Sequence, residues 1–315
     1  MVAVKDPSII HWKGKYHVYA TGAYSSGPNA TDFKMIYTSF KSFEEIAKKP
    51  PKITFLDQTP GFAVYGCAPQ IFYYSPHKLW YLIFQSPNPT YSTSTDPSNP
   101  KSWTAPKIMV DALPELPTAE AGPNSWETWI DFFVICDDTH CHLYYSNDYG
   151  DWFRQETTKA KFPLGWSKAY HMWNASRPID FFEGGAIYKI KGEKSLYLGI
   201  HEAATDEWVR YYQSYTANSL RGPWKPYLVT PEHPFAGVNN TVFAKNTKWS
   251  KGHGNSGISH GEILRAGVDE RMEIDPCDLK LLFQGTVGPN DDYLYLPYRL
   301  GLLTSTVKGP GCKKH

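Results

Sequence analysis

Apolar and aromatic runs recur along the whole chain, and each is followed by a turn and a second such run. The clearest are IIHWKGKYHVYAT (9–21), PQIFYYSPHKLWYLIFQ (69–85), IDFFVICDDTHCHLYYSN (130–147) and GGAIYKIKGEKSLYLGIHEA (184–203). Each reads as strand, turn, strand, with Gly, Pro, Asn or Asp in the middle. Long helical periodicity is absent, and the best helix candidate is SFEEIAKK, where Ser42 can act as the N-cap. The pattern predicts an all-β protein.

These strand pairs repeat with a rough period. The corresponding residues Asp6, Pro69, Asp131, Glu183 and His260 lie 63, 62, 52 and 77 positions apart. A unit of this size holds about four short strands and fits a propeller blade with insertions better than a sandwich. Five units fit 315 residues, and no internal linker is visible. We therefore predict a five-bladed β-propeller that forms a single domain over residues 1–315.

Polar residues stand where the inner strand of each blade is expected to begin. Asp6 occurs in VKDPSII, Asp131 in WIDFFVI, Glu183 in FFEGGAI and His260 in ISHGEIL. Inner strands line the axis of a propeller, and their starts converge on one end of the channel. We expect three carboxylates from three blades to meet at one pocket.

Composition and charge exclude some partners. The chain has 32 Lys and Arg against 31 Asp and Glu, so no basic excess points to nucleic acid or an acidic membrane face. No run of about 18 apolar residues could span a membrane. Aromatic residues make up 16% of the chain, and they suit both sugar stacking and a β core. MVAVKDPSII lacks the basic and apolar regions of a signal peptide, so we expect a mature or trimmed chain.

Five cysteines are present, at positions 67, 136, 141, 277 and 312, so at least one thiol stays free if the others pair. None has zinc-finger spacing. Cys136 and Cys141 flank a DDTH turn and could face each other across a hairpin. Glycosylation sequons at Asn29, Asn174 and Asn239 give weak support for secretion.

The phrases of this chain, taken in order, resemble glycoside hydrolase family 62, the α-L-arabinofuranosidases that act on arabinoxylan. The resemblance runs from residue 2 to about 306. It rests on VAVKDPSIIHWKGKYHVYAT, LDQTPGF, APQIFYYSPHKLWYLIFQ, YSTSTD, WTAPK, IDFFVICDDTHCHLYYSND, FEGGAIYKI, HPFAGV, SHGEILR, IDPCDLKLLFQG and YLPYRLGLLT. It implies a secreted, monomeric five-bladed propeller that acts on a polysaccharide.

The resemblance also implies roles for individual residues. Asp6 would be the general base, Glu183 the general acid, and Asp131 the carboxylate that orients the acid and adjusts its pKa. His260 would hold a calcium ion in the central channel, mostly through waters. Three further residues would contact the substrate, namely Lys5, Gln85 and Tyr293.

The chain departs from the family pattern in several places. It has Leu294 where the family usually has Asn, which removes a hydrogen bond to the xylan backbone, and Cys67 where Ala is usual. The segments 24–33 and 245–256 are longer than expected and would reshape the rim of the cleft. In the family, a strand that precedes VAVKDP closes the ring. That strand is not in this sequence, and we expect the unusual tail STVKGPGCKKH to compensate for it. In the family the DPC cysteine usually pairs with a cysteine near the N-terminus, which this chain lacks. We therefore predict a Cys277–Cys312 bond here, and we expect Cys67 to be a buried free thiol.

The chemistry explains the odd position of Glu183. Hydrolysis with inversion needs one protonated and one ionised carboxyl group on opposite sides of the anomeric carbon. A normal Glu, with a pKa of about 4.3, is mostly ionised at pH 6. The neighbouring Phe181 and Phe182, with a nearby Asp131, would disfavour the charged form. We interpret Glu183 as a carboxyl group placed where it keeps its proton.

Two alternatives stay open at this point. One is another furanosidase or xylosidase of the related five-bladed propeller families, which product analysis would separate. The other is a non-catalytic, lectin-like propeller that uses the aromatic cleft for binding only. A binding module has no need of a protonated Glu, so the three carboxylates favour an enzyme.

Overall fold

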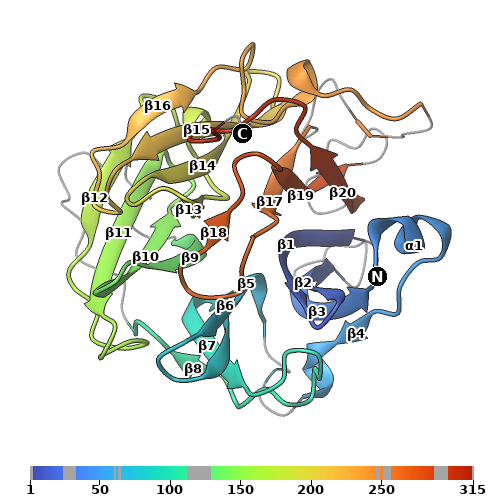
Figure 1. Ribbon diagram of the computed structural model, residues 1–315, viewed down its shortest axis with the longest axis vertical. Helices are drawn as coiled ribbons and strands as arrows, with labels where there is room; N and C mark the ends of the chain where they lie inside the picture. The colour runs from blue at the N-terminus through green and yellow to red at the C-terminus, as the bar shows by residue number, and fades with distance from the viewer. Residues whose placement is uncertain are drawn as a thin grey trace.

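The strands form five sheets arranged as blades around a common axis (Figure 1). The structure is a computed structural model, and it describes residues 3–23, 33–59, 62, 65–111, 129–245, 249–250, 257–286 and 297–313. Within these ranges the prediction of an all-β, five-bladed propeller is confirmed.

The first three blades each contain four strands, numbered outward from the axis. Blade one has β1–β4, at Ala3–Trp12, Lys15–Ala23, Phe33–Phe40 and Thr54–Phe55. Blade two has β5–β8, at Cys67–Tyr74, Leu79–Ser86, Asn88–Ser94 and Lys107–Ile108. Blade three has β9–β12, at Ile130–Cys136, His140–Ser146, Asp151–Thr158 and Tyr170–Asn174.

The last two blades are joined through one short strand. Blade four has β13–β16, at Ala186–Ile190, Tyr197–Ala204, Arg210–Ala217 and Lys225–Leu228. Among the described residues, blade five has β17, β19 and β20, at Ser259–Ile263, Lys280–Thr286 and Tyr298–Thr304. Between β17 and β19 the chain crosses to blade four, where β18 (Glu273–Ile274) pairs in parallel with β13. All four hairpins expected from the sequence are present.

One α-helix, α1 (Phe43–Lys48), leaves the first blade. Ser42 Oγ accepts a hydrogen bond from the Glu45 backbone N–H at 3.2 Å, as expected for an N-cap. Single 3-10 turns occur at Leu56–Gln58, Pro178–Asp180 and Val238–Asn240. No helix among the described residues is long and apolar enough to cross a membrane.

Buried tyrosines join each blade to the next. The hydroxyl of Tyr19 donates to Pro97 O at 2.6 Å, and that of Tyr74 donates to Lys159 O at 2.7 Å. In blade four, the hydroxyl of Tyr212 accepts from Gly261 N of blade five at 2.7 Å. A tyrosine ring fills the space between sheets while its hydroxyl pairs with a backbone group. Much of the aromatic content therefore belongs to the core.

The first and last blades are packed together. Leu282 of β19 shares an apolar cluster with Ile9, Val18 and Ile36 of the first blade. Glu262 Oε2 accepts from Ile9 N at 3.0 Å, which links the two inner strands. An apolar cavity of about 210 Å³ lies at this junction, between β2, β3, α1 and β20. These contacts close the ring in the described chain.

The cross-segment, residues 266–274, ties the other blades together at the end of the channel where the inner strands finish. Its carbonyls accept backbone hydrogen bonds from blades two, three and four, which come from Tyr73, Cys136, Lys189 and Lys191 to Val268, Glu270, Met272 and Ile274, respectively. Figure 1 shows this crossing between β17 and β18. One segment of the fifth blade thus fixes the spacing of three other blades.

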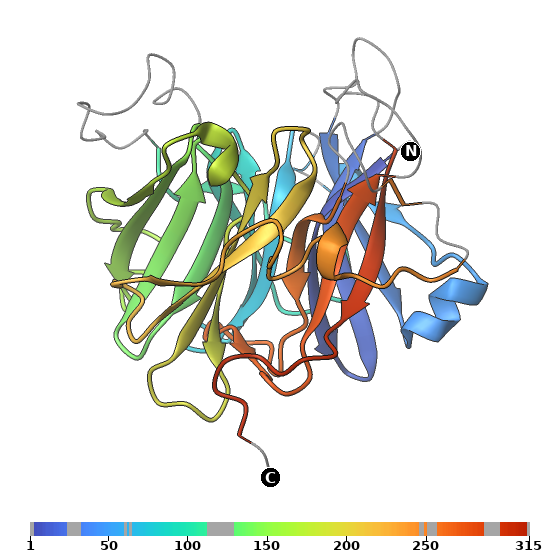
Figure 2. The same cartoon turned by 90° about the horizontal axis from the view of Figure 1, so that it is seen from above.

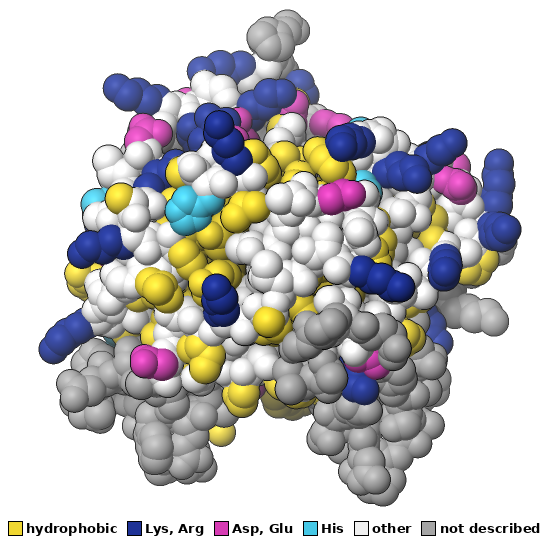
Figure 3. Space-filling model, turned by 90° about the horizontal axis from the view of Figure 1, so that it is seen from below, with side chains coloured by type: hydrophobic (Ala, Val, Ile, Leu, Met, Phe, Trp, Pro, Cys, Tyr) yellow, Lys and Arg dark blue, Asp and Glu magenta, His cyan; other side chains and the backbone are white. Residues whose placement is uncertain are grey.

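The disulfides agree with the sequence-based expectations. Cys277 and Cys312 are bonded, and so are Cys136 and Cys141, while Cys67 is buried and free. The first bond anchors the tail beside blade four, where Lys313 pairs with Glu193 at 2.8 Å. The C-terminus lies at the opposite end of the axis from the start of β1 (Figure 2). In Figure 3, Lys and Arg side chains are scattered singly over the visible face, with Asp and Glu among them.

Candidate active site

The inner strands bulge at equivalent positions near one end of the axis. The ladder between β1 and β2 breaks between Lys5 and Ser8, and three other inner strands break in the same way. Three residues at these bulges have left-handed backbones, with φ of 49° at Asp6, 48° at Ala68 and 57° at Asp131, and so does Gly184, just before β13, with φ of 67°. The three that are not glycine each cost roughly 1–2 kcal/mol. A bulge re-aims a side chain, and here the strained positions surround one site.

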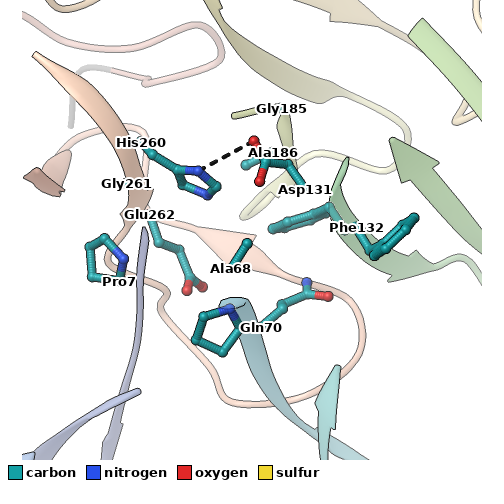
Figure 4. Close-up of a pocket in the computed structure, with 12 residues that line it drawn as sticks. Pro7, Ala68, Gln70, Asp131, Phe132, Gly185, Ala186, His260, Gly261 and Glu262 are labelled. Carbon is teal, nitrogen blue, oxygen red and sulfur yellow. Dashed lines mark ion pairs between the residues drawn. The ribbon is translucent and has the colours of Figure 1, made fainter. Parts of the chain in front are cut away.

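His260 joins two of the predicted carboxylates. Its Nδ1 lies 3.5 Å from Asp6 Oδ1 and 3.4 Å from Asp131 Oδ2, and Figure 4 shows the pair with Asp131. Burial lowers the pKa of His260, but the charges of Asp131 and Asp6 outweigh burial and raise it to about 10. The imidazole is therefore a cation at neutral pH, shared by a carboxylate from blade one and another from blade three.

Asp131 is held in its ionised form. Its Oδ2 also accepts a hydrogen bond from the Gly184 backbone N–H at 2.8 Å. Burial acts to raise the pKa of Asp131, but His260 and the Gly184 N–H outweigh it, and the pKa lies below its usual range. Through Gly184, Asp131 fixes the backbone next to Glu183, which is consistent with the expected orienting role.

Glu183 is not the lone carboxylate that its sequence setting suggests. It precedes β13 by three residues, and its Oε1 contacts Nη1 of Arg210 in β15. The same Nη1 lies 3.1 Å from Glu202 Oε2. The Arg210 side chain is 4% exposed, and that of Glu202 is fully buried. One buried guanidinium thus forms ion pairs with two acidic side chains.

The two glycines after Glu183 are required by the residues behind them. A Cβ at Gly184 would lie 2.4 Å from Glu202 Oε1, and a Cβ at Gly185 would lie 2.8 Å from the His201 ring. Gly184 also has a left-handed backbone, which glycine adopts without steric cost. The FEGG sequence therefore lets Glu183 approach the Arg210–Glu202 pair closely.

Two further carboxyl groups near Glu183 have pKa values raised to the neutral range. Burial raises the pKa of Glu202 to about 7, an effect that Arg210 only partly offsets. Asp148 lies in the turn between β10 and β11. Its residue surface is exposed, but partial enclosure of its carboxyl group and the charges of Glu183 and Asp131 raise the pKa of Asp148 to about 8. The group of carboxyls around Glu183 can therefore store a proton.

Two of the three residues predicted to contact the substrate, Lys5 and Gln85, lie near the bulges of the inner strands. Lys5 directly precedes Asp6, and its Nζ lies 5.6 Å from the centre of the Tyr298 ring. Gln85, the second-last residue of β6, lies opposite Cys67, one residue before the bulge at Ala68. Tyr293 lies outside the described residues, as do Leu294, Asn29 and most of both long insertions.

Sequence reasoning missed Arg210, Glu202 and Asp148. A signal for the first two existed, because Arg210 and Glu202 are charged residues inside the apolar runs WVRYY and GIHEAA. Such charges carry a desolvation cost unless they are paired. Asp148 gave no signal, because SNDYGD reads as an ordinary turn.

A calcium ion would have to take most of its ligands from water. The described residues bring no three His, Cys, Asp or Glu side chains together in a way that could hold a metal. His260 could offer Nε2 only as a neutral imidazole, so an ion bound there would displace one proton of the imidazolium. Nδ1–H would stay directed at the carboxylates, and metal-bound histidines often donate the other ring N–H to a carboxylate. The cavity beside His260 measures about 20 Å³, room for about one water molecule, so a hydrated ion would widen it. The chemistry of His260 fits an ion held by one imidazole and waters.

Comparisons with known proteins give consistent matches. The model of glycosyl hydrolase family 62 matches residues 1–304. Alpha-L-arabinofuranosidase C of Cellvibrio japonicus is 38% identical over 304 residues, which are 96% of this chain but 44% of that protein. The chain thus spans less than half of this curated relative.

Two solved structures are similar over nearly the whole chain. The catalytic domain of the Coprinopsis cinerea family 62 α-L-arabinofuranosidase has a TM-score of 0.88 at 36% identity, covering 97% of this chain and 92% of that one. A family 62 hydrolase in complex with xylotriose has a TM-score of 0.86 at 36% identity, with the same coverage.

Proposed function

The chain belongs to glycosyl hydrolase family 62, and from this membership we propose that it is an inverting, exo-acting α-L-arabinofuranosidase. It would remove single arabinose side chains from arabinoxylan. One observation carries the proposal. Carboxyl groups from three blades, Asp6, Asp131 and Glu183, stand at one end of the channel, and each has a cation or a backbone N–H as its partner. The names of the relatives, which are arabinofuranosidases, support the choice of sugar.

Asp6 is the proposed general base. A general base takes a proton from the water that attacks the anomeric carbon. The His260 cation lies on one side of the Asp6 carboxylate, and Gln284 Oε1 accepts a 2.7 Å hydrogen bond from the Asp6 backbone N–H. These contacts hold the bulge in place, so the carboxylate can direct a water toward the anomeric carbon.

Glu183 is the proposed general acid. It must give its proton to the leaving oxygen, and the carboxylate that results needs a counter-ion. Arg210 already touches Oε1 of Glu183, so it stabilises the charge that the reaction creates. The proton-holding carboxyls of Glu202 and Asp148 supply a local source for reprotonation.

The test is release of arabinose from arabinoxylan by the purified chain. Asp6→Asn and Glu183→Gln should each lower turnover by several orders of magnitude while the fold is kept, because each removes one half of the proton exchange. Asp278→Asn is the matched control, since Asp278 is an exposed carboxylate paired only with Lys280. Retention of more than about a tenth of the wild-type rate by Glu183→Gln would show that the acid is assigned wrongly.

The substrate and the location are part of the proposal. A β-1,4-xylan backbone is supported by the family 62 structure that contains xylotriose. Secretion is supported by the two disulfides, because such bonds persist in oxidising compartments. We propose a monomer.

We also propose a structural calcium ion on the axis, held by His260 Nε2 and waters. Calcium prefers oxygen ligands, so the ion would tie the blades together and take no part in the chemistry. Chelation should lower the melting temperature more than it lowers the rate measured at low temperature. A channel axis without an ion in a high-resolution crystal structure grown with calcium would refute this proposal.

A further inference from the structure

Trp208 is an exposed aromatic residue in a strained position. It lies in the turn between β14 and β15, its side chain is 44% exposed, and its φ is +58°. A tryptophan with a left-handed backbone costs roughly 1–2 kcal/mol, and leaving its indole in water forgoes burial as well. Two costs at one residue point to a use for the exposed ring.

The turn holds this ring in a defined place. Trp208 N donates to Thr205 O at 2.8 Å, and Thr205 N donates to Val209 O at 3.1 Å. The neighbouring Asp206 forms an ion pair with Arg177 at 2.5 Å. The indole is therefore presented by a closed turn rather than by a loose loop.

The indole stands next to the proposed acid. It meets the ring of Phe182 edge to face, with centroids 6.2 Å apart. The guanidinium of Arg210 lies over the same Phe182 ring at 4.8 Å, and Arg210 contacts Glu183. Trp208 thus forms an exposed surface that is linked to the acid through the buried Phe182 and Arg210.

The reaction places the leaving group on this surface. A general acid protonates the leaving oxygen, so the sugar attached to that oxygen lies on the side of Glu183. The leaving sugar of arabinoxylan is a xylopyranose, which has flat C–H faces and no hydroxymethyl group to interfere with stacking. Aromatic side chains bind such faces while the hydroxyls stay in water.

We propose that Trp208 is a specificity-determining residue that stacks on a xylopyranose ring of the backbone, on the leaving-group side of Glu183. The inference rests on the proposed function for its choice of sugar. Its test uses binding of xylotriose, which carries no arabinose and is no substrate of an arabinofuranosidase. The test can therefore distinguish a failure of Trp208 as a stacking platform for xylose from a failure of the proposed function.

The experiment measures the Kd for xylotriose by calorimetry with the full chain. Trp208→Ala should raise the Kd about tenfold, and Trp208→Phe should restore most of the affinity. Trp208→Gly should also bind weakly yet melt close to the wild type, since glycine adopts the turn without strain. Tyr227→Ala is the matched control, because Tyr227 is also 44% exposed but lies on the outer strand β16.

Activity supplies a second readout. Trp208→Ala should lower kcat/KM about tenfold on an arabinoxylo-oligosaccharide and leave it unchanged on methyl α-L-arabinofuranoside, whose leaving group has no ring. An unchanged Kd in Trp208→Ala, an equal loss in Tyr227→Ala, or no xylotriose binding by the wild type would overturn the proposal. If the wild type binds xylotriose through Trp208 but releases no arabinose, the platform stands and the proposed function falls.

Discussion

Glu183 has to satisfy two opposite requirements. It must hold a proton before the reaction and tolerate a negative charge after it. Its neighbours in sequence, Phe181 and Phe182, are buried, and Arg210 contacts its Oε1. The apolar setting could be predicted from FFEGG alone. The contact with Arg210 could not, because Arg210 lies 27 positions away and only the pairing of β14 with β15 brings it back to Glu183.

His201 lies against Gly185 of the FEGG sequence and leads to a prediction for the pH dependence of stability. Its ring stacks on Phe181 with centroids 3.6 Å apart, and burial lowers the pKa of His201 to about 3. In the unfolded chain a histidine titrates near 6.5. Between these two values the unfolded state binds the extra proton, so stability falls as the pH drops from 6.5 toward 3.

The expected loss attributable to His201 between pH 7 and pH 5 is about 2 kcal/mol. Urea unfolding of the wild type and of His201→Gln at both pH values measures it. The variant starts from a lower stability but should lose less on acidification, because glutamine does not titrate. Parallel losses in the two proteins would mean that His201 is already protonated, or free to become so, in the folded state.

Most individual strands could be predicted, but the bulges could not. The alternation of apolar runs and turns placed the four quoted hairpins correctly. The left-handed backbones at Asp6, Ala68 and Asp131 have no sequence signal of their own, since each residue type also occurs in ordinary strands. In blade four the left-handed backbone falls at Gly184 and not at Glu183. The position within the repeat therefore identified the right segment of blade four, but it was one residue away from the position that corresponds to Asp6 and Asp131.

The disulfide that anchors the C-terminal tail leads to a prediction for the stability of the protein. Cys277 and Cys312 close a loop with a sequence separation of 35. Replacing both by Ala should lower the free energy of unfolding by roughly 3–4 kcal/mol in the chain-entropy model. Cys67→Ala is the control, because it removes a thiol without opening a bridge and should cost about 1 kcal/mol. Denaturant unfolding compares them, and alkylation of Cys277 in the unreduced protein would contradict the assignment.

For the whole molecule, the roughly 60-residue period was enough to predict five blades around one axis. The contacts between blades could not be predicted, because they depend on partners far apart in sequence. The cross-segment 266–274 bonds to three other blades, and Arg265 beside it donates to Ile9 O and Ile71 O. Tyrosine hydroxyls do the same between neighbouring sheets. Such contacts hold the carboxylates of different blades at fixed positions around the axis.

The central claim is that Asp6 and Glu183 act on opposite sides of the anomeric carbon. Proton NMR of the reaction with arabinoxylo-oligosaccharide, recorded before mutarotation, tests it most directly. The account predicts that β-L-arabinofuranose appears first, because the water directed by Asp6 attacks the face opposite the leaving group. Initial α-L-arabinofuranose would indicate a covalent intermediate and would contradict the role of Asp6 as a general base.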